Sequence, residues 1–246
     1  MTSPPLKIAL VTGGAVRLGR AIVEHLANAG MSVALHYFGS KTAADETVRA
    51  LRARSQTVTA FQADLTAPGA PEQLVREVES QLGPLSLLVN SAAMFERAPL
   101  VETQEALFDA HWALNVKAPY LLTQAAARLM VQRQTGHIVN VLDIKGAMRP
   151  FPNYSAYAAT KAALAQLTQS WAVELAPHVR VNAVAPGSVL PPDAYSPQVR
   201  ERLLARIPQR RFAGADAVAE AVLLLENGPK SVTGQILAVD GGESLV

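Results

Sequence analysis

The sequence contains no cysteine and carries little net charge. Without cysteine the chain forms no disulfide, offers no thiolate nucleophile and has no cysteine-ligated metal site, which agrees with a reducing compartment. The formal charge of +2 is too small for the basic surface that nucleic-acid binding requires. The five histidines show no spacing typical of metal ligands. We therefore expect neither a nucleic-acid partner nor a bound metal.

Long apolar runs are missing as well. No run reaches the roughly 18 residues that a membrane span needs, and the initial segment MTSPPLK has no signal-peptide pattern. Hydrophobic residues nevertheless make up 50% of the 246 positions, which is enough to bury one large core. We expect a cytoplasmic globular protein with no membrane partner, formed by one domain over residues 1–246.

Seven short β-rich runs alternate with longer helical patterns. The runs are continuously apolar, as in strands that are covered on both faces. Strand and helix in alternation indicate a parallel sheet with right-handed crossovers. The expected fold class is α/β, a single Rossmann-type doubly wound domain with a mainly parallel seven-stranded sheet. The runs start at residues 7, 32, 58, 85, 137, 179 and 235, and the helical patterns cover 17–29, 42–54, 71–82, 104–133, 155–176 and 215–226.

The stretch TGGAVRLG follows the first run and opens the first helical pattern. Gly13 and Gly14 permit a tight turn whose backbone N–H groups approach a pyrophosphate, and Gly19 lets the helix pack closely on the sheet. Arg17 stands where many such turns carry another glycine. Its guanidinium either holds a phosphate bidentately or is a solvated residue of the helix. In a strand-to-helix context this turn predicts a dinucleotide site.

The segment after the second run favours NADP over NAD. NAD enzymes usually place an acid on the ribose hydroxyls, but residues 35–44 contain no acid. Ser40 and Lys41 stand where a 2′-phosphate would lie, and Lys41 is alternatively a surface residue at a helix start. His36 and Tyr37 are either core residues or face the adenosine. We expect NADP(H) as the cofactor.

Tyr157 and Lys161 are four residues apart at the start of a helical pattern, so they share one face. A nearby ammonium stabilises a phenolate and lowers the tyrosine pKa from about 10. The tyrosine then serves as general acid when a hydride is delivered. Lys161 is also a candidate for holding the nicotinamide ribose.

These motifs together resemble the short-chain dehydrogenases/reductases over nearly the whole chain. The matching stretches are TGGAVRLG, ADL, NSAA, LNVKAPY, YAATK, VNAVAPGS and TGQILAVDGG. The resemblance implies a doubly wound fold, a nicotinamide cofactor and an active site of Ser, Tyr, Lys and Asn, of which Tyr157, Lys161 and Asn115 are present. It also implies a homo-oligomer, a dimer or tetramer, built on the helices over 104–133 and 155–176.

Roles carried over from the family complete the expected cofactor site. The family's Asn shapes a helix bend that holds a water in the proton relay, a role that Asn115 inherits. Asp64 matches the acid that binds the adenine amino group, and Pro186 starts the loop beside the nicotinamide amide. The expected cofactor-binding residues are Gly13, Arg17, Leu18, Gly19, Tyr37, Ser40, Lys41, Asp64, Leu65, Asn90, Ala92, Tyr157, Lys161, Pro186, Gly187 and Val189.

Asp143 takes the position of the family's serine. An ionised carboxylate about 4 Å from a developing oxyanion raises the barrier by up to roughly 4 kcal/mol at an effective dielectric of 20. Either Asp143 is therefore protonated or the substrate is not a simple ketone. A substrate with N–H donors and a reducible C=N bond suits an acid here. Alternatively Asp143 pairs with Lys145 or Arg149, or caps a turn.

Pteridine reductases and dihydromonapterin reductases within the family show this pattern, and the chain resembles them further. Arg17 in RLGR and Phe95 after the fourth run match residues that contact their substrate. The resemblance implies NADPH-dependent reduction of a pterin or dihydrofolate-like ring, with hydride delivered to carbon and Tyr157 protonating the adjacent nitrogen. The expected substrate-binding residues are Arg17, Phe95, Asp143 and Tyr157. Phe95 is alternatively a core aromatic.

Two other functions compete with pterin reduction. One is reduction of a 3-oxoacyl thioester, and the other is a non-catalytic NADP-binding regulator, against which the intact Asn115, Tyr157 and Lys161 argue. The arginine-rich stretch from Gln198 to Gly214 is expected to belong to a substrate lid around 188–213, with a nucleic-acid patch as the alternative.

Overall fold

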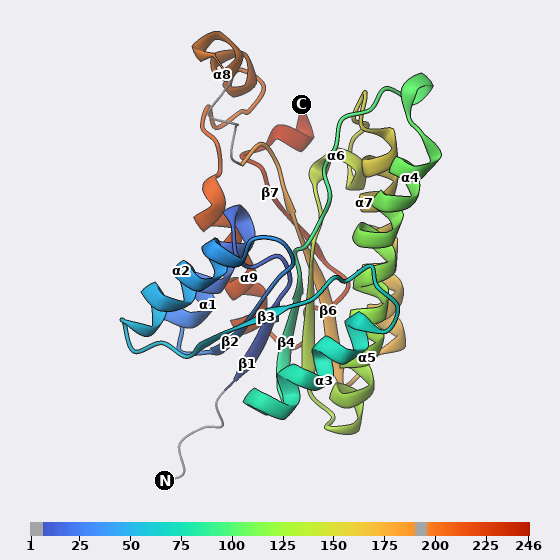
Figure 1. The fold of residues 1–246 in the computed structure, drawn as a ribbon. Coiled ribbons are helices and arrows are strands. Elements are labelled where there is room, and N and C mark those ends of the chain that lie inside the picture. The colour runs from blue at the N-terminus through green and yellow to red at the C-terminus, as the bar shows by residue number, and fades with distance from the viewer. Residues whose placement is uncertain (1–6, 190–195) are drawn as a thin grey trace.

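The computed structural model describes residues 7–189 and 196–246. Its seven strands are β1 (Ile8–Val11), β2 (Ser32–Tyr37), β3 (Val58–Gln62), β4 (Leu85–Asn90), β5 (Gly136–Val141), β6 (Val179–Pro186) and β7 (Ile236–Val239). They form one sheet in the order β3-β2-β1-β4-β5-β6-β7, and every strand pairing is parallel (Figure 1). The expected α/β fold class is confirmed.

The strands are continuously apolar because both faces of the sheet are covered. In β1, Ile8 and Leu10 pack into one core cluster, while Ala9 and Val11 pack into the other. All eight residues of β6 are buried. Side chains alternate between the two faces of a strand, so an apolar residue at every position is what a sheet between two helical layers needs.

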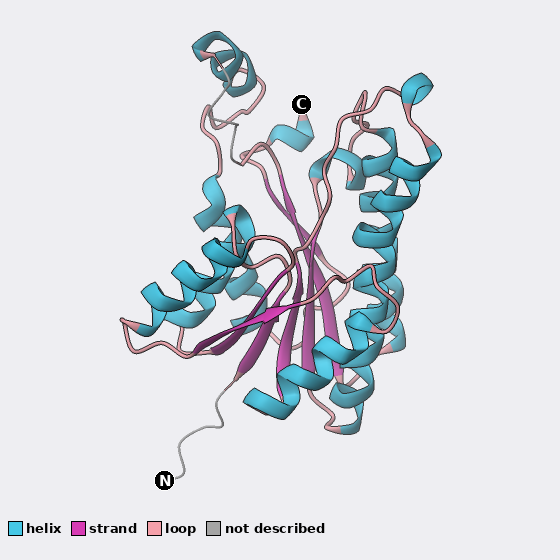
Figure 2. Ribbon diagram, viewed as in Figure 1, coloured by secondary structure: helices cyan, strands magenta, loops and turns pink. Residues whose placement is uncertain are grey.

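Helices form a layer on each face of the sheet (Figure 2). One layer contains α1 (Arg17–Asn28), α2 (Lys41–Arg52) and α9 (Gly214–Asn227), whose buried residues pack with Leu35 and Val184. The other contains α3 (Ala70–Leu82), α5 (Ala118–Gln132) and α7 (Ser155–Glu174), which pack with Leu88 and Ile138. These helices match the sequence expectation within two residues at each end, with one exception.

The exception is the pattern over 104–133, which is not one continuous helix. After a 3₁₀ turn, η1 (Leu100–Glu102), it divides into α4 (Glu105–Trp112), a π-helical turn η2 (Ala113–Lys117) and α5. Pro119 has no N–H to donate to the carbonyl of Asn115, four residues earlier, so a regular α-helical ladder is interrupted there. Asn115 lies inside the π turn, a feature that often marks functional sites.

The arginine-rich stretch forms a short helix, α8 (Pro197–Leu204), none of whose residues is buried. Ser196 caps it by accepting a hydrogen bond from the Val199 N–H. In Figure 1, α8 stands out beyond the carboxyl ends of the strands. Residues 190–195 of the expected lid lie outside the described residues, so the lid around 188–213 stays a prediction.

The sheet order places the expected motifs on one rim. β1 lies between β2 and β4, so the chain runs outwards in opposite directions from this point of the sheet. In such sheets ligands bind outside the carboxyl ends of the strands, at the point where the strand order reverses. The turn after β1 and the segments that follow β4, β5 and β6 all lie at that edge.

Candidate functional site

The turn after β1 depends on glycine at two positions. Gly13 has φ +64°, and a Cβ atom built on it would lie 3.0 Å from Cα of Ala92. A Cβ atom on Gly19 would overlap the carbonyl group of Gly13. The turn, the start of α1 and the segment after β4 are therefore in close contact, as a site for a pyrophosphate backbone requires. Leu18 packs against the core cluster under α1.

Thr12 joins this turn to β4, and sequence reasoning missed it. Its hydroxyl oxygen accepts hydrogen bonds from the backbone N–H groups of Ser91 and Ala92, both at 3.0 Å. Thr12 is 1% exposed, so this contact fixes the distance between the turn and the segment after β4. Arg17 opens α1 with φ +50° and is exposed at the rim.

His36 is a core residue. Its Nδ1 accepts a hydrogen bond from the Gly13 N–H at 3.2 Å, and its Nε2 donates to the carbonyl of Ala63 at 3.0 Å. Burial lowers the pKa of His36, so a neutral ring suits both bonds. Tyr37 is 7% exposed and belongs to the core cluster under α1. The core alternative is therefore confirmed for His36, which ties the first turn to the end of β3.

Ser40 and Lys41 lie exposed at the start of α2. The Lys41 ammonium is 2.8 Å from a carboxylate oxygen of Asp45, one turn further along the helix. The surface alternative for Lys41 is realised in the structure, although an exposed pair of this kind is weak enough to exchange for a phosphate.

Asp64 and Leu65 follow β3. Asp64 Oδ1 accepts hydrogen bonds from the Thr66 hydroxyl at 2.6 Å and the Thr66 N–H at 2.9 Å, and these bonds lower the pKa of Asp64. Leu65 is 4% exposed and packs in the core. The turn therefore presents an ionised carboxylate at a fixed position on the rim.

The side chain of Asn90 points into the core. It is 2% exposed, and its Nδ2 donates to Oδ1 of Asn140 at 2.9 Å and to the hydroxyl of Thr123 at 3.2 Å. We expected Asn90 to bind the cofactor, but this side chain joins β4, β5 and α5 instead. The segment after β4 can therefore contact a ligand through its backbone or through Ala92.

Asp143 and Tyr157 are in direct contact at the carboxyl end of β5. The Tyr157 hydroxyl donates a hydrogen bond of 3.0 Å to Asp143 Oδ2, while Asp143 Oδ1 accepts 2.7 Å from the N–H of Lys145. One oxygen therefore caps α6 (Ile144–Ala147), which realises the cap alternative, and the other meets the phenol. Burial raises the pKa of Asp143 against the opposing effect of these bonds.

The expected effect of Lys161 on the tyrosine is wrong for the protein chain alone. Burial, together with the charge of Asp143, raises the pKa of Tyr157 well above its ordinary value. The Lys161 ammonium donates to the carbonyl of Val141 at 2.9 Å and lies 5.8 Å from the centre of the Tyr157 ring. Complete burial lowers the pKa of Lys161 to about 8. Spacing alone predicted the shared face but not the burial that dominates both pKa values.

Asn115 holds the segment after β4 by its amide. Its Oδ1 accepts from the Met94 N–H at 2.8 Å, and its Nδ2 donates to the Met94 carbonyl at 2.9 Å. The Nδ2 also donates to the Thr160 hydroxyl at 3.2 Å, one turn after Tyr157. Asn115 thus joins the π turn, the Met94 backbone and α7 in one buried contact.

Phe95 belongs to a cluster of four aromatic rings rather than to the core. It is 54% exposed, its face stacks on Tyr154 at 4.7 Å between ring centres, and it meets the Tyr157 ring edge-on at 4.8 Å. Tyr154 in turn stacks on Phe151 at 4.2 Å. The core alternative for Phe95 is therefore wrong. Sequence reasoning missed Phe151 and Tyr154, although their spacing of three before Tyr157 is visible in PFPNYSAY.

The loop after β6 completes the rim. Pro186 ends the strand, and a Cβ atom on Gly187 would lie 2.6 Å from Cβ of Asp240. The next residue, Ser188, donates its N–H to Glu243 Oε2 at 2.8 Å. Val189 packs against the core cluster under α9. Close packing against the segment after β7 therefore fixes the path of this loop.

Within residues 7–189 and 196–246, no group of His, Asp and Glu side chains is placed to hold a metal ion. In the same ranges, no helix has the length and apolar character needed to cross a membrane.

Comparison with known proteins gives the family. A family model described as enoyl-(acyl carrier protein) reductase matches residues 14–244. The chain belongs to the short-chain dehydrogenase/reductase family. It is 36% identical over 240 residues to the 3-oxoacyl-[acyl-carrier-protein] reductase FabG of Staphylococcus aureus, covering 96% of this chain and 97% of that protein. FabG of Thermotoga maritima is 34% identical over the same shares of the two chains.

Solved structures of this oxidoreductase family are similar over the whole fold. FolM alternative dihydrofolate reductase 1 from Brucella suis, in complex with NADP, superposes with a TM-score of 0.91 at 33% identity, covering 98% of this chain and 96% of that chain. The Brucella canis protein, also complexed with NADP, gives the same score and identity and is covered to 94%. The curated relatives and the structural neighbours thus carry two different substrate names.

Proposed function

We propose that this protein is an NADPH-dependent reductase of a pterin or dihydrofolate-like ring. The observation that carries the proposal is the 3.0 Å hydrogen bond from Tyr157 to Asp143. A carboxylate next to the proton donor is unfavourable for a substrate oxygen that becomes negative. It is favourable for a ring whose N–H groups need an acceptor.

The proposed roles follow from the geometry of the side chains. The raised pKa keeps Tyr157 protonated at neutral pH, which suits a proton donor in a reduction. Asp143 accepts N–H groups of the ring and thereby sets its orientation. Tyr157 passes its proton to the ring nitrogen adjacent to the carbon that is reduced. The exposed ring of Phe95 offers an aromatic face beside Tyr157 for stacking.

The residues on the rim fit a nicotinamide dinucleotide. The close approach of Gly13 to Ala92 gives the turn the tight shape of a pyrophosphate site, and the Asp64 carboxylate can accept a hydrogen bond from an amino group. When bound, NADPH supplies the hydride. We assign the phosphates to the turn with Arg17, the adenine to Asp64, and the nicotinamide to Lys161 and the loop from Pro186 to Val189. The NADP complexes of the FolM proteins support this choice of cofactor.

The second candidate is a 3-oxoacyl thioester reductase, which the names of the curated relatives favour. For this reaction Asp143 would have to be protonated when the substrate oxygen gains charge. Burial raises the pKa of Asp143, which is the direction that the alternative needs. The non-catalytic regulator is the weakest candidate, because a binding module has no use for a buried Tyr–Asp–Lys arrangement.

The test is NADPH oxidation with dihydrobiopterin, dihydrofolate and an acetoacetyl thioester under the same conditions. We expect turnover of at least one pterin at a kcat/KM at least tenfold above that of the thioester. Turnover of the thioester alone would reject the proposal, and turnover of none of the three would favour the regulator.

We also propose a homo-oligomer, a dimer or tetramer, that uses the outer faces of α5 and α7. Tyr120 and Val131 of α5 are 44% and 37% exposed, and Val173 of α7 is 80% exposed. Large apolar side chains gathered on neighbouring helices favour burial against a second copy. Light scattering after size-exclusion chromatography tests this. A single species of about 26 kDa would contradict it.

A further inference from the structure

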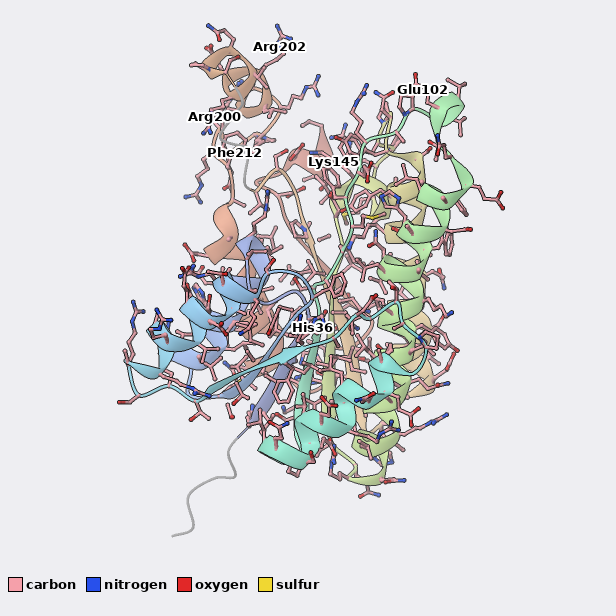
Figure 3. All side chains as sticks on the ribbon, viewed as in Figure 1. His36, Glu102, Lys145, Arg200, Arg202 and Phe212 are labelled. Atoms are coloured by element: carbon pink, nitrogen blue, oxygen red, sulfur yellow. The ribbon has the colours of Figure 1, made fainter. Side chains whose placement is uncertain are left out.

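A pocket of about 510 Å³ lies beside the Asp143–Tyr157 pair and has no role in the proposed proton transfer. Lys145, Arg149 and Arg206 contribute to its wall, together with the ring of Phe151 and the side chain of Glu243. Lys145 is two residues beyond Asp143, so the wall of the pocket starts directly after this acid. Figure 3 shows Lys145 at the same end of the molecule as Arg200 and Arg202 of α8.

The pocket has more positive than negative charge. Its one side-chain carboxylate, on Glu243, is 8% exposed and is already engaged by Ser188 and by Lys145, whose ammonium lies 3.4 Å away. Arg149 donates to the backbone carbonyl of Glu243, so its positive charge is not neutralised by that bond. The guanidinium of Arg206 makes no hydrogen bond or ion pair within the described ranges. Three cationic side chains facing one occupied side-chain carboxylate favour an anionic ligand.

Aromatic rings connect this pocket to the reacting centre. From Tyr157 the path runs edge-on to Phe95, whose face stacks on Tyr154. Tyr154 stacks on Phe151 with an interplanar angle of 10°, and Phe151 forms the wall of the pocket. The Lys145 ammonium lies 5.2 Å from the centre of the Phe151 ring. An aromatic surface therefore connects the site of reduction with the cationic groups, and a flat, apolar group could pack on it.

We propose that this pocket binds the carboxylates of an extended substrate, a pterin whose ring is joined through an aromatic spacer to an anionic tail. Lys145, Arg149 and Arg206 receive the tail, and the rings of Phe95 and Phe151 contact the spacer. This inference rests on the proposed function and narrows its substrate to pterins that carry an anionic tail. A pterin with a short, uncharged side chain leaves the cationic pocket without a partner.

The test compares two substrates that share the reducible ring, dihydrofolate with the anionic tail and dihydrobiopterin without it. In Arg206→Gln we expect the ratio of kcat/KM for dihydrofolate to that for dihydrobiopterin to fall by about tenfold, as one charge-assisted hydrogen bond is lost. The change should lie in KM for dihydrofolate. Arg206→Glu should lower the ratio further, by roughly 100-fold, because it also introduces repulsion.

Arg202→Gln, on the exposed helix α8 and outside the pocket wall, is the matched control and should keep the wild-type ratio within twofold. Raising the salt concentration should increase KM for dihydrofolate in the wild type more than in Arg206→Gln. An unchanged ratio in both Arg206 variants, while the wild type reduces pterins, would overturn this inference and leave the proposed function standing. A wild type that reduces neither pterin would remove the proposed function and this inference together.

Discussion

Asp143 has two simultaneous tasks, and each uses a different oxygen. Oδ1 caps the turn that starts α6, and Oδ2 accepts from the Tyr157 phenol. Burial raises the pKa of Asp143, so ionisation in this position costs free energy that an exposed aspartate would not lose. A buried carboxyl group whose ionisation is made unfavourable in this way is typical of functional positions.

Replacing Asp143 by serine restores the family's usual residue and should reverse the substrate preference. We expect Asp143→Ser to lower kcat/KM for dihydrobiopterin by about 100-fold, which corresponds to roughly 3 kcal/mol of lost contacts with the ring. NADPH affinity, measured by fluorescence titration, should stay within a few-fold. Loss of NADPH binding would mean that the acid acts on the structure of the site.

Asp143→Asn removes the charge of the side chain but keeps an oxygen that can cap α6. Asparagine caps a helix as well as aspartate does, so the turn should persist. Because burial makes the carboxylate unfavourable, we expect the variant to melt about 1–3 °C higher at pH 7, as for a gain of up to about 1 kcal/mol in a chain of this size. Pterin reduction should fall in the same variant. A lower melting temperature by calorimetry would show that the ionised group stabilises the fold.

At the scale of elements, the helical pattern over 104–133 marks what the sequence could and could not predict. Apolar residues at helical spacing predicted helix over this region, and the outer ends of the pattern match the start of α4 and the end of α5 within one residue. The π turn between them was not visible in the apolar pattern, although the family resemblance implied a helix bend at Asn115, whose side chain contacts Met94, 21 residues away. Contacts between distant segments also explain why the inward side chain of Asn90 was missed.

Asn115→Ala tests whether this contact holds the site together. The substitution leaves the Met94 N–H and carbonyl without partners in a partly buried place, so we expect a loss of about 1–3 kcal/mol in the free energy of unfolding. Because Met94 precedes Phe95, we also expect kcat for the pterin to fall by at least tenfold. Urea denaturation and steady-state kinetics measure the two effects.

Pro119→Ala is the control for the backbone contribution to the π turn. It restores an N–H four residues after Asn115 but leaves the amide contacts of Asn115 in place. If those contacts dominate, the variant should keep kcat within about threefold, since the side chain continues to hold Met94. A collapse of activity in Pro119→Ala alone would assign the turn to the proline.

At the scale of the whole molecule, the parallel topology gathers the functional groups at one edge of the sheet and a buried ionic cluster at the other. The rim was predictable, because the carboxyl ends of parallel strands share an edge wherever the strand order places them. The cluster was not, because Lys7, His137, Arg180 and Glu226 are far apart in the sequence. Glu226 lies 2.7 Å from Lys7 and 2.9 Å from His137. It thereby joins the residue before β1 with β5 and α9.

Glu226→Gln should destabilise the protein at pH 7. Removing the carboxylate leaves the buried Arg180 guanidinium without its partner, and breaking a buried ion pair typically costs about 3–5 kcal/mol. For a chain of this length that corresponds to a fall of roughly 6–15 °C in melting temperature. Glu72→Gln is the matched control, since its pair with Arg76 is more than half exposed on both sides. It should change stability by less than about 0.5 kcal/mol.

The same cluster fixes the sign of the pH dependence of stability. Its hydrogen bonds with His137 and Lys7 outweigh burial and lower the pKa of Glu226 from 4.5 to about 2. The unfolded chain therefore binds more protons between these values, so the contribution of Glu226 is complete above pH 4.5 and is lost as the pH falls towards 2. Burial also lowers the pKa of His137, whose contribution is lost as the pH falls below 6.5.

Denaturant unfolding curves measured from pH 7 to pH 3 should accordingly show a steady decrease in the free energy of unfolding of the wild type. In Glu226→Gln the loss below pH 4.5 should be smaller, because the carboxylate that takes up the proton is absent. Two stability curves that run parallel through this range would contradict the depressed pKa. The acid sensitivity would then have to arise elsewhere, and Asp240, whose pKa is also lowered by hydrogen bonds from Ser244 and Gly242, is the next group to replace.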